Sequence, residues 1–206
     1  MRREPFITFE GIDGSGKSTQ ARLLADYLRQ TGRDVVLTRE PGGSAGAEEI
    51  RRLLVEGAPE RWSPETEILL FTAARRDHLE KTIRPALDSG KAVVSDRFAD
   101  STRVYQGAAR SDLRGLVDRL HAAVISTEPD LTFVVDMDPT TALSRGLARH
   151  NGEVRFEDMG LHFQERLREG FRGLAKEFPA RCVLIDGDRS PDAIASEIAA
   201  LAEQRT

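Results

Sequence analysis

Residues 11–18 have the residue types and the spacing of a loop that can wrap a polyphosphate. Their sequence, Gly-Ile-Asp-Gly-Ser-Gly-Lys-Ser, fits the pattern G-x-x-x-x-G-K-[ST] and lies between a strand-like and a helix-like run. The glycines let backbone N–H groups point at an anion, and the helix would offer it the positive end of its dipole. Lys17 could then reach the outer phosphates, and Ser18 could coordinate Mg²⁺. The segment predicts a nucleoside triphosphate site; the alternative is a glycine-rich turn that matches by accident.

Asp96 and Arg97 close a later strand-like run and could serve the same phosphates. An acid at such a strand end can hold Mg²⁺ through the water shell of the ion, and an adjacent arginine can bridge phosphates with two N–H groups. A surface ion pair is the alternative. Asp136 and Asp138, near the end of another strand-like run, could be the magnesium-associated acids instead, but we favour Asp96.

Two further segments suggest a second ligand. Phe71 and Arg75 lie four residues apart in the helix-like run 65–87, so both project from one helix face. Phe71 could stack on a base while Arg75 donates to a carbonyl on the base edge; a core aromatic beside a solvated arginine is the simpler alternative. Residues 38–43, Thr-Arg-Glu-Pro-Gly-Gly, could bind a second anion or could form a plain turn.

Three arginines surround the polar segment 150–153, which we expect to belong to a short mobile lid over roughly residues 145–156. Arg145 and Arg149 share a helix face by their four-residue spacing, and Arg155 follows the polar segment. Such a cluster suits a transferring phosphoryl group, whose charge it could neutralise. A solvated helix face is the alternative.

The elements that must position these residues alternate between strand and helix. Five short runs rich in Val, Ile, Leu and Phe predict buried parallel strands at 6–10, 35–38, 92–95, 131–136 and 182–186. Helix-like runs lie between them, and Ser-Pro-Glu at 63–65 and Ser-Pro-Asp at 190–192 predict helix starts. The pattern predicts an α/β fold with a doubly wound sheet, whose ligands collect at the carboxyl ends of the strands.

Composition limits the class of protein. A chain of 206 residues suits a single domain, 1–206, and no apolar run approaches the roughly 18 residues of a membrane span. We expect a cytoplasmic protein without a secretory leader, in which the single Cys182 is a buried structural thiol. The net charge of −4 argues against broad nucleic-acid binding. His78, His121 and His162 show no metal-ligand spacing.

Taken in order, five segments strongly resemble bacterial thymidylate kinase. They are residues 9–19 (FEGIDGSGKST), 38–43 (TREPGG), 70–75 (LFTAAR), 96–98 (DRF) and 101–107 (STRVYQG). The resemblance implies a P-loop nucleoside monophosphate kinase fold with a five-stranded parallel sheet, a homodimer, and small-molecule substrates with neither nucleic acid nor membrane as a partner. The implied reaction is ATP + dTMP ⇌ ADP + dTDP with Mg²⁺, a step in dTTP biosynthesis.

The resemblance also implies roles for individual residues. Those implied for ATP are Gly11, Ile12, Asp13, Gly14, Ser15, Gly16, Lys17, Ser18 and Thr19, with Arg145 flanking adenine. Those implied for dTMP are Asp13, Arg39, Pro41, Phe71, Arg75, Arg97, Ser101, Thr102, Tyr105 and Gln106. Ser18 and, through water, Asp96 would serve the metal. Arg39 and Arg97 would hold the dTMP phosphate, while Phe71 stacks on thymine and Arg75 with Gln106 reads its edge.

The catalytic group implied by the resemblance comprises Lys17, Arg97 and two arginines of the lid. Some members of the family carry an arginine inside the phosphate loop, at the position where Gly14 stands here. This chain therefore resembles the variety that supplies the charge from the lid, through Arg149 or Arg155. Asp13 would contact the acceptor or its metal, and Tyr105 would crowd the ribose 2′ position, which favours deoxyribose.

Overall fold

The described residues form a sheet of five parallel strands whose carboxyl ends lie along one edge. The strands are β1 (Phe6–Glu10), β2 (Val35–Arg39), β3 (Ala92–Asp96), β4 (Leu131–Asp136) and β5 (Cys182–Asp186). Their spatial order is β2-β3-β1-β4-β5. The structure is a computed structural model and describes residues 4–58, 61–110, 112–147 and 160–205. All five predicted strands are confirmed, and β2 and β3 each run one residue further than the sequence predicted.

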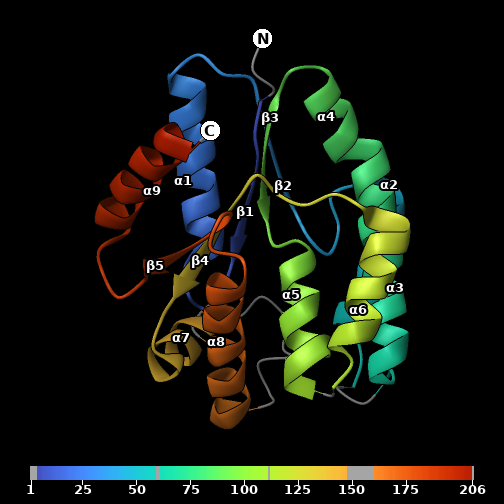
Figure 1. Cartoon of the computed structure of the whole chain (residues 1–206). Helices are drawn as coiled ribbons and strands as arrows, with labels where there is room; N and C mark the ends of the chain where they lie inside the picture. The colour runs from blue at the N-terminus through green and yellow to red at the C-terminus, as the bar shows by residue number, and fades with distance from the viewer. Residues whose placement is uncertain (1–3, 59–60, 111, 148–159, 206) are drawn as a thin grey trace.

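Helices connect successive strands and cover both faces of the sheet (Figure 1). They are α1 (Lys17–Gln30), α2 (Ala45–Val55), α3 (Pro64–His78), α4 (Arg84–Asp88), α5 (Ala99–Val104), α6 (Arg114–Leu120), α7 (Pro139–Leu147), α8 (Gly160–Glu177) and α9 (Pro191–Arg205). Turns of π-helix continue three of them, at Leu79–Ile83 after α3, Tyr105–Arg110 after α5 and His121–Ile125 after α6. The predicted doubly wound α/β architecture is confirmed.

Side chains alternate along the central strands, so each face of the sheet packs against its own group of helices. In β4, Phe133 and Val135 pack in the core shared with α1 and α9, whereas Val134 faces the core under α8. A third core, around Phe6 and Val93, lies against α4 and its preceding π-helical turn. Because helices cover both faces, the strands can be apolar on both sides, which is why they appear in the sequence as continuous apolar runs.

Helix starts follow the signals in the sequence. The Ser63 side chain accepts a hydrogen bond from the Thr66 backbone N–H, and the Ser190 hydroxyl oxygen accepts one from the Ala193 N–H. Both helices therefore begin at the predicted Ser-Pro pairs.

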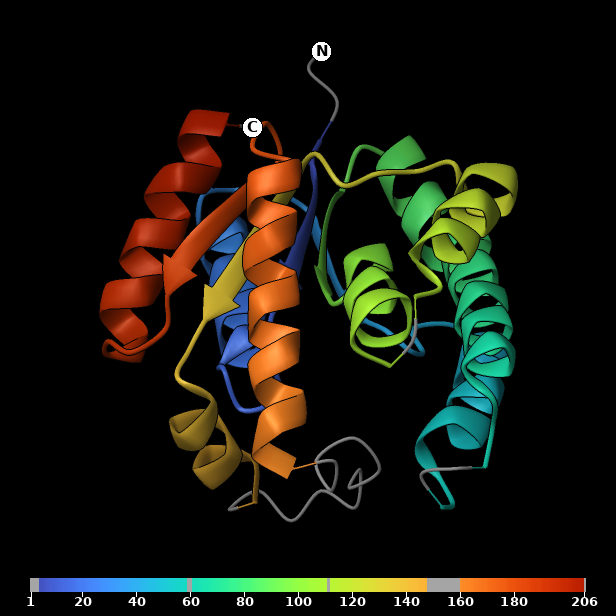
Figure 2. The ribbon, with the colours of Figure 1, turned by 60° about the horizontal axis from the view of Figure 1, so that its bottom comes forward.

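The carboxyl edge of the sheet is the natural position for a ligand in this architecture. Figure 2 brings this edge toward the viewer and shows α5 lying between α8 and α3. Both described chain ends lie at the opposite end of the molecule (Figure 1).

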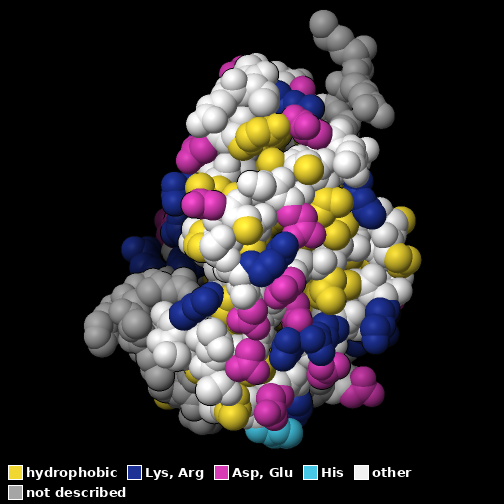
Figure 3. Space-filling model, turned by 90° about the vertical axis from the view of Figure 1, so that its left-hand side faces the viewer, with side chains coloured by type: hydrophobic (Ala, Val, Ile, Leu, Met, Phe, Trp, Pro, Cys, Tyr) yellow, Lys and Arg dark blue, Asp and Glu magenta, His cyan; other side chains and the backbone are white. Residues whose placement is uncertain are grey.

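The side of the molecule formed by α1 and α9 carries acidic and basic side chains interleaved with scattered apolar ones (Figure 3). No single-sign patch dominates this face, unlike the basic stripe typical of nucleic-acid binding. Among the described helices, none has both the length and the apolar character needed to cross a membrane.

Candidate active site

The phosphate loop, residues 11–18, joins β1 to α1 and is packed tightly on α7. Gly14 has a φ of +85°, and a Cβ added there would lie 1.9 Å from the Ala142 carbonyl oxygen of α7. Only glycine fits such a close approach, so this position excludes an arginine in this arrangement. The Ser15 hydroxyl is buried and makes no hydrogen bond within the described structure. An unsatisfied polar group inside the loop is what a bound phosphate would satisfy.

Lys17 and Asp13 face each other across the loop. The Lys17 ammonium donates to Asp13 Oδ1 and to the Ile12 carbonyl oxygen, each at 3.2 Å. Burial, and then the nearby charge of Arg97, lowers the pKa of Lys17. Burial alone would raise the pKa of Asp13, but Arg97 and Lys17 outweigh it and hold this pKa well below its usual range. The loop therefore holds a carboxylate paired with two cations before any phosphate enters.

Arg97 connects the end of β3 to the phosphate loop. Its guanidinium donates to Asp13 Oδ1 at 2.5 Å, to the Ser101 hydroxyl at 2.8 Å and to the Tyr105 hydroxyl at 3.2 Å. Its backbone φ of +72° lies in the left-handed region, which costs energy for a residue with a Cβ. Such strain persists where the surroundings hold a residue in place, as they do for this arginine.

Glu10 is a residue of the site that the sequence analysis did not single out. It ends β1, is fully buried, and accepts hydrogen bonds from the Phe98 N–H at 2.8 Å, the Ser101 N–H at 3.2 Å and the Ser101 hydroxyl at 2.6 Å. These bonds hold the turn on which Arg97 sits and satisfy the N-terminus of α5. In the sequence, only its position at the end of a strand and next to the phosphate loop could have pointed to a role in the site. Its hydrogen-bond partners lie about ninety residues away along the chain.

Burial, with the charge of Asp100, raises the pKa of Glu10 from 4.5 to about 7, although Arg97 opposes the shift. The folded protein therefore binds this proton more tightly than the unfolded chain, so stability is lost as pH rises from about 4.5 to about 7. At about 1.4 kcal/mol per pH unit, the full effect is on the order of 3 kcal/mol.

Glu10→Gln should remove this particular pH dependence, because the amide does not titrate. Urea unfolding of both proteins at pH 5, 6, 7 and 8 measures the effect. We expect wild-type stability to fall relative to that of the variant between pH 5 and pH 7.5. A stability difference that stays constant with pH would show that Glu10 is already ionised at pH 5.

Asp96 is placed as a magnesium-associated acid would be. It ends β3 and pairs in register with Phe9 of β1, directly before the phosphate loop. Its Oδ1 atom is buried and has no hydrogen-bond partner within the described structure. A buried, unpaired carboxylate oxygen beside a phosphate site fits a hydrated Mg²⁺, which usually keeps several waters. Ser18 is exposed at the start of α1, where its hydroxyl is open to a ligand.

Asp136, the competing acid, is occupied by arginines from α8. It accepts from Arg168 at 2.7 and 2.9 Å and from Arg172 at 2.8 and 3.2 Å. Burial opposes ionisation of Asp136, but these hydrogen bonds outweigh it and hold its pKa below the usual range. Asp138 caps α7 through the Thr140 and Thr141 N–H groups. Among the described residues, the carboxylates of Asp136 and Asp138 are thus already paired, whereas Asp96 Oδ1 is not.

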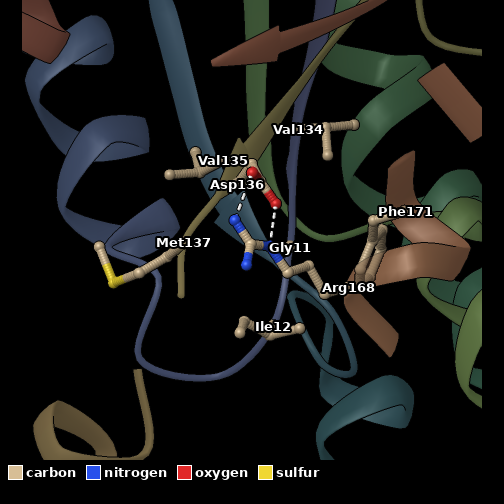
Figure 4. A pocket seen from close by; sticks show the side chains of 8 residues that line it. All are labelled: Gly11, Ile12, Val134, Val135, Asp136, Met137, Arg168 and Phe171. Carbon is tan, nitrogen blue, oxygen red and sulfur yellow. Dashed lines mark hydrogen bonds and ion pairs between the residues drawn. The ribbon is translucent and has the colours of Figure 1, made fainter. Parts of the chain in front are cut away.

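The Asp136–Arg168 pair borders a small crevice behind the phosphate loop (Figure 4). The lining residues are Gly11, Ile12, Val134, Val135, Asp136, Met137, Arg168 and Phe171. In Figure 4 the Arg168 guanidinium points at the Asp136 carboxylate, so the pair is already satisfied.

Arg75 is buried and is held through Nε and Nη2, which excludes a solvated arginine. Its Nε donates to Glu40 Oε2 at 2.8 Å, and its Nη2 donates to the Phe98 carbonyl oxygen at 3.1 Å and the Thr102 hydroxyl at 3.0 Å. Phe71 is only half-buried and belongs to none of the hydrophobic cores. A ring that is neither in a core nor fully exposed is available for stacking.

The structure brings together some predicted site residues and separates others. Asp13, Lys17, Arg97, Ser101 and Tyr105 share one hydrogen-bond network. Gln106 instead donates to the buried Glu67, at 3.2 Å.

The remaining predicted residues lie around the network. Arg39 is half exposed and forms an ion pair with Glu48 at 3.0 Å, while Pro41, which follows it in the same loop, is half-buried. Arg145 is exposed on α7 and contacts Met137 Sδ at 3.3 Å. Gly16 and Thr19 lie in the phosphate loop and the first turn of α1. Arg149, Arg155 and most of the predicted lid lie outside the described residues.

The five-stranded sheet and its loop, with an Asp–Arg pair at the end of the neighbouring strand, define a P-loop kinase of the nucleoside monophosphate type. Comparison with known proteins narrows this class. The family model described as thymidylate kinase matches residues 9–198, and the chain belongs to the thymidylate kinase family.

Relatives cover nearly the whole chain. A thymidylate kinase of Jannaschia sp. (strain CCS1) is 70% identical over 200 residues, covering 97% of this chain and 96% of that protein. One from Caulobacter vibrioides is 53% identical over 201 residues, covering 97% and 96%. The crystal structure of thymidylate kinase from Ehrlichia chaffeensis has a TM-score of 0.80 at 38% identity, covering 98% of this chain and 99% of that one.

Proposed function

We propose that this chain transfers the terminal phosphoryl group of ATP to dTMP, giving ADP and dTDP, with Mg²⁺ as the metal. Membership of the thymidylate kinase family supports the reaction. The observation that carries the residue assignment is the position of Arg97, which contacts the phosphate loop through Asp13 and contacts Tyr105 on the acceptor side. Two anionic substrates would therefore meet at one guanidinium.

Phosphoryl transfer needs little covalent work from the protein, because the acceptor is already a phosphate oxygen. It needs the two substrates held in line and the developing charge neutralised. Lys17 would meet the outer phosphates of ATP, and Arg97 with Arg39 would hold the dTMP phosphate. Asp13, which pairs with both Lys17 and Arg97 in this structure, would keep these cations in place until phosphates replace part of its contacts.

Asp96, through water, and Ser18 would hold Mg²⁺, which supplies positive charge to the bridging phosphates when bound. We also assign one lid arginine, Arg149 or Arg155, to the transferred phosphoryl group. Exclusion of an arginine at Gly14 by α7 supports this division of labour. A closed lid would keep water from the reacting phosphate and limit wasteful hydrolysis of ATP.

Thymine would lie against Phe71, with Arg75 and Gln106 at its edge and Tyr105 near the ribose 2′ position. Phe71→Ala should raise the dTMP KM by about tenfold, because base stacking is worth about 1–3 kcal/mol. The ATP KM should stay near normal, since ATP does not use this ring. Steady-state kinetics with each substrate varied in turn provide the measurement, and Glu65→Ala, which changes an exposed residue of α3, is the control. Equal increases in the dTMP KM and the ATP KM would indicate that Phe71 contributes to packing and does not stack on the base.

An acceptor panel tests the function directly. ADP formation is followed with ATP, Mg²⁺ and one of dTMP, dUMP, UMP, CMP, GMP or thymidine. We expect dTMP to be the best acceptor and thymidine to be inactive, because thymidine lacks the phosphate that Arg97 would hold. Preference for thymidine would identify a nucleoside kinase, and ADP formation without any acceptor would identify a nucleotide hydrolase.

We further propose that the chain works as a homodimer in the cytoplasm on these small molecules alone. Leu69 on α3 is 56% exposed and Val124, in the π-helical turn after α6, is 39% exposed, and these two elements are in contact. Exposed apolar side chains on adjoining elements are suited to a subunit interface. Sedimentation analysis at micromolar concentration measures the mass, and a monomer would contradict the dimer.

A further inference from the structure

A chain of polar side chains, most of them buried, continues from Arg75 through Glu40 and His78. Glu40 is at its centre, with Oε2 accepting from Arg75 Nε at 2.8 Å and Oε1 paired with His78 Nδ1 at 3.0 Å. His78 Nε2 then meets the Thr38 hydroxyl at 2.7 Å. The exposed fraction is 4% for Arg75 and 0% for His78, so these members are shielded from water, while Thr38 at the outer end is half-buried. None of the roles assigned above uses His78.

The hydrogen-bond chemistry fixes the donor at Nδ1. A carboxylate only accepts, so His78 Nδ1 carries a proton that it donates to Glu40. Nε2 pairs with the Thr38 hydroxyl, so both ring nitrogens have a hydrogen-bond partner. The ring also lies close against Gly43, where an added Cβ would be only 2.4 Å from Nε2. His78 therefore holds Glu40 Oε1 in one place.

This arrangement leaves one end of Arg75 for a ligand. Nε is taken by Glu40, and Nη2 is taken by Phe98 and Thr102. Nη1 makes no hydrogen bond to any residue in the described part of the chain. Because the guanidinium is planar and rigid, fixing Nε and Nη2 fixes the direction of the Nη1 hydrogens.

We propose that His78 is a positioning residue for selection of the acceptor base: it holds Glu40, which orients Arg75 so that Nη1 meets a carbonyl on the base edge. The inference rests on the proposed function, in which Arg75 reads thymine. A base with an amino group in place of that carbonyl would bring an N–H donor against the N–H groups of Arg75. A guanidinium held in one orientation cannot rotate to relieve this repulsive contact. His78 thus contributes to the preference for dTMP over dCMP.

The test compares two replacements of His78 with wild type. His78→Phe keeps a ring of similar size and removes both hydrogen bonds. His78→Asn keeps an N–H donor close to the position of Nδ1 and can still bind Glu40. For each protein, kcat and KM are measured with dTMP and with dCMP, and the ATP KM and the melting temperature are recorded.

We expect His78→Phe to raise the dTMP KM about tenfold and to lower the dTMP-to-dCMP ratio of kcat/KM, with the ATP KM unchanged. His78→Asn should recover most of both effects. Loss of packing could lower the melting temperature of both variants equally. It would not explain a change in base preference in His78→Phe that His78→Asn reverses.

Three results would overturn the inference: an unchanged dTMP KM in active His78→Phe, equal increases in the dTMP and ATP KM values, or no recovery in His78→Asn. If His78→Phe does not fold, Thr38→Val provides a second test, because it removes only the hydrogen bond between Thr38 and His78. We expect it to raise the dTMP KM about twofold, and an unchanged dTMP KM would contradict the inference. Absence of dTMP phosphorylation by wild type would overturn the proposed function and this inference together.

Discussion

Lys17→Ala is expected to lower kcat by about 10² to 10³ while leaving the protein folded. The Lys17 ammonium is buried, yet among the described residues its hydrogen-bond partners are only Asp13 and the Ile12 carbonyl oxygen. We expect this ammonium group to pair with the phosphates of the bound nucleotide. Asp13 keeps its bonds to Arg97 and Tyr105 in the variant, so the loop should not collapse.

The measurement is kcat at saturating ATP and dTMP, with circular dichroism and melting temperature to confirm folding. Lys91→Ala, which removes an exposed lysine before β3, serves as the matched control and should retain full activity. Turnover close to wild type in folded Lys17→Ala would refute the assignment of residues 11–18 as the phosphate loop.

Alanine in place of one lid arginine should lower kcat and kcat/KM together by about 10³, with both KM values changed little. The expectation applies to Arg149→Ala or Arg155→Ala, whichever residue meets the charge that develops during transfer. It is supported by the phosphate loop, where α7 leaves no room for a side chain at Gly14.

Single-turnover rates identify which arginine has this role, because they exclude product release. Arg22→Ala removes an exposed arginine paired with Asp26 on α1 and is the control. Near-normal single-turnover rates in both lid variants would show that Arg97, Lys17 and Mg²⁺ suffice without the lid.

Local patterns predicted the strands well, because each strand is a short apolar run, and the three central strands β3, β1 and β4 are buried on both faces. The phosphate loop was equally accessible, since its glycines, lysine and serine are contiguous in sequence. Asp96 and Arg97 could be proposed for the same reason. Only the structure shows that Asp136 is occupied by Arg168 and Arg172, which come from a helix more than thirty residues later.

The supporting residues of the site could not be read from the sequence. Glu10, Glu40 and His78 are buried titratable side chains whose partners lie on other elements. Periodicity placed Arg75 on a helix face but could not tell whether that face was solvated. Hydrogen bonds to Glu40 and Thr102 decide that it is not. The three π-helical turns likewise have no signature in the local sequence that we used.

The contact between Gly14 and α7 has an evolutionary consequence. A mutation of Gly14 to arginine would place side-chain atoms where the Ala142 carbonyl already lies. A lineage with this arrangement therefore cannot acquire a loop arginine by a single codon change. The backbone of α7 would first have to move away from the loop, and until then the positive charge that we assign to a lid arginine would have to come from the lid. We therefore expect any relative that carries an arginine at this position of the phosphate loop to have α7 displaced away from the loop.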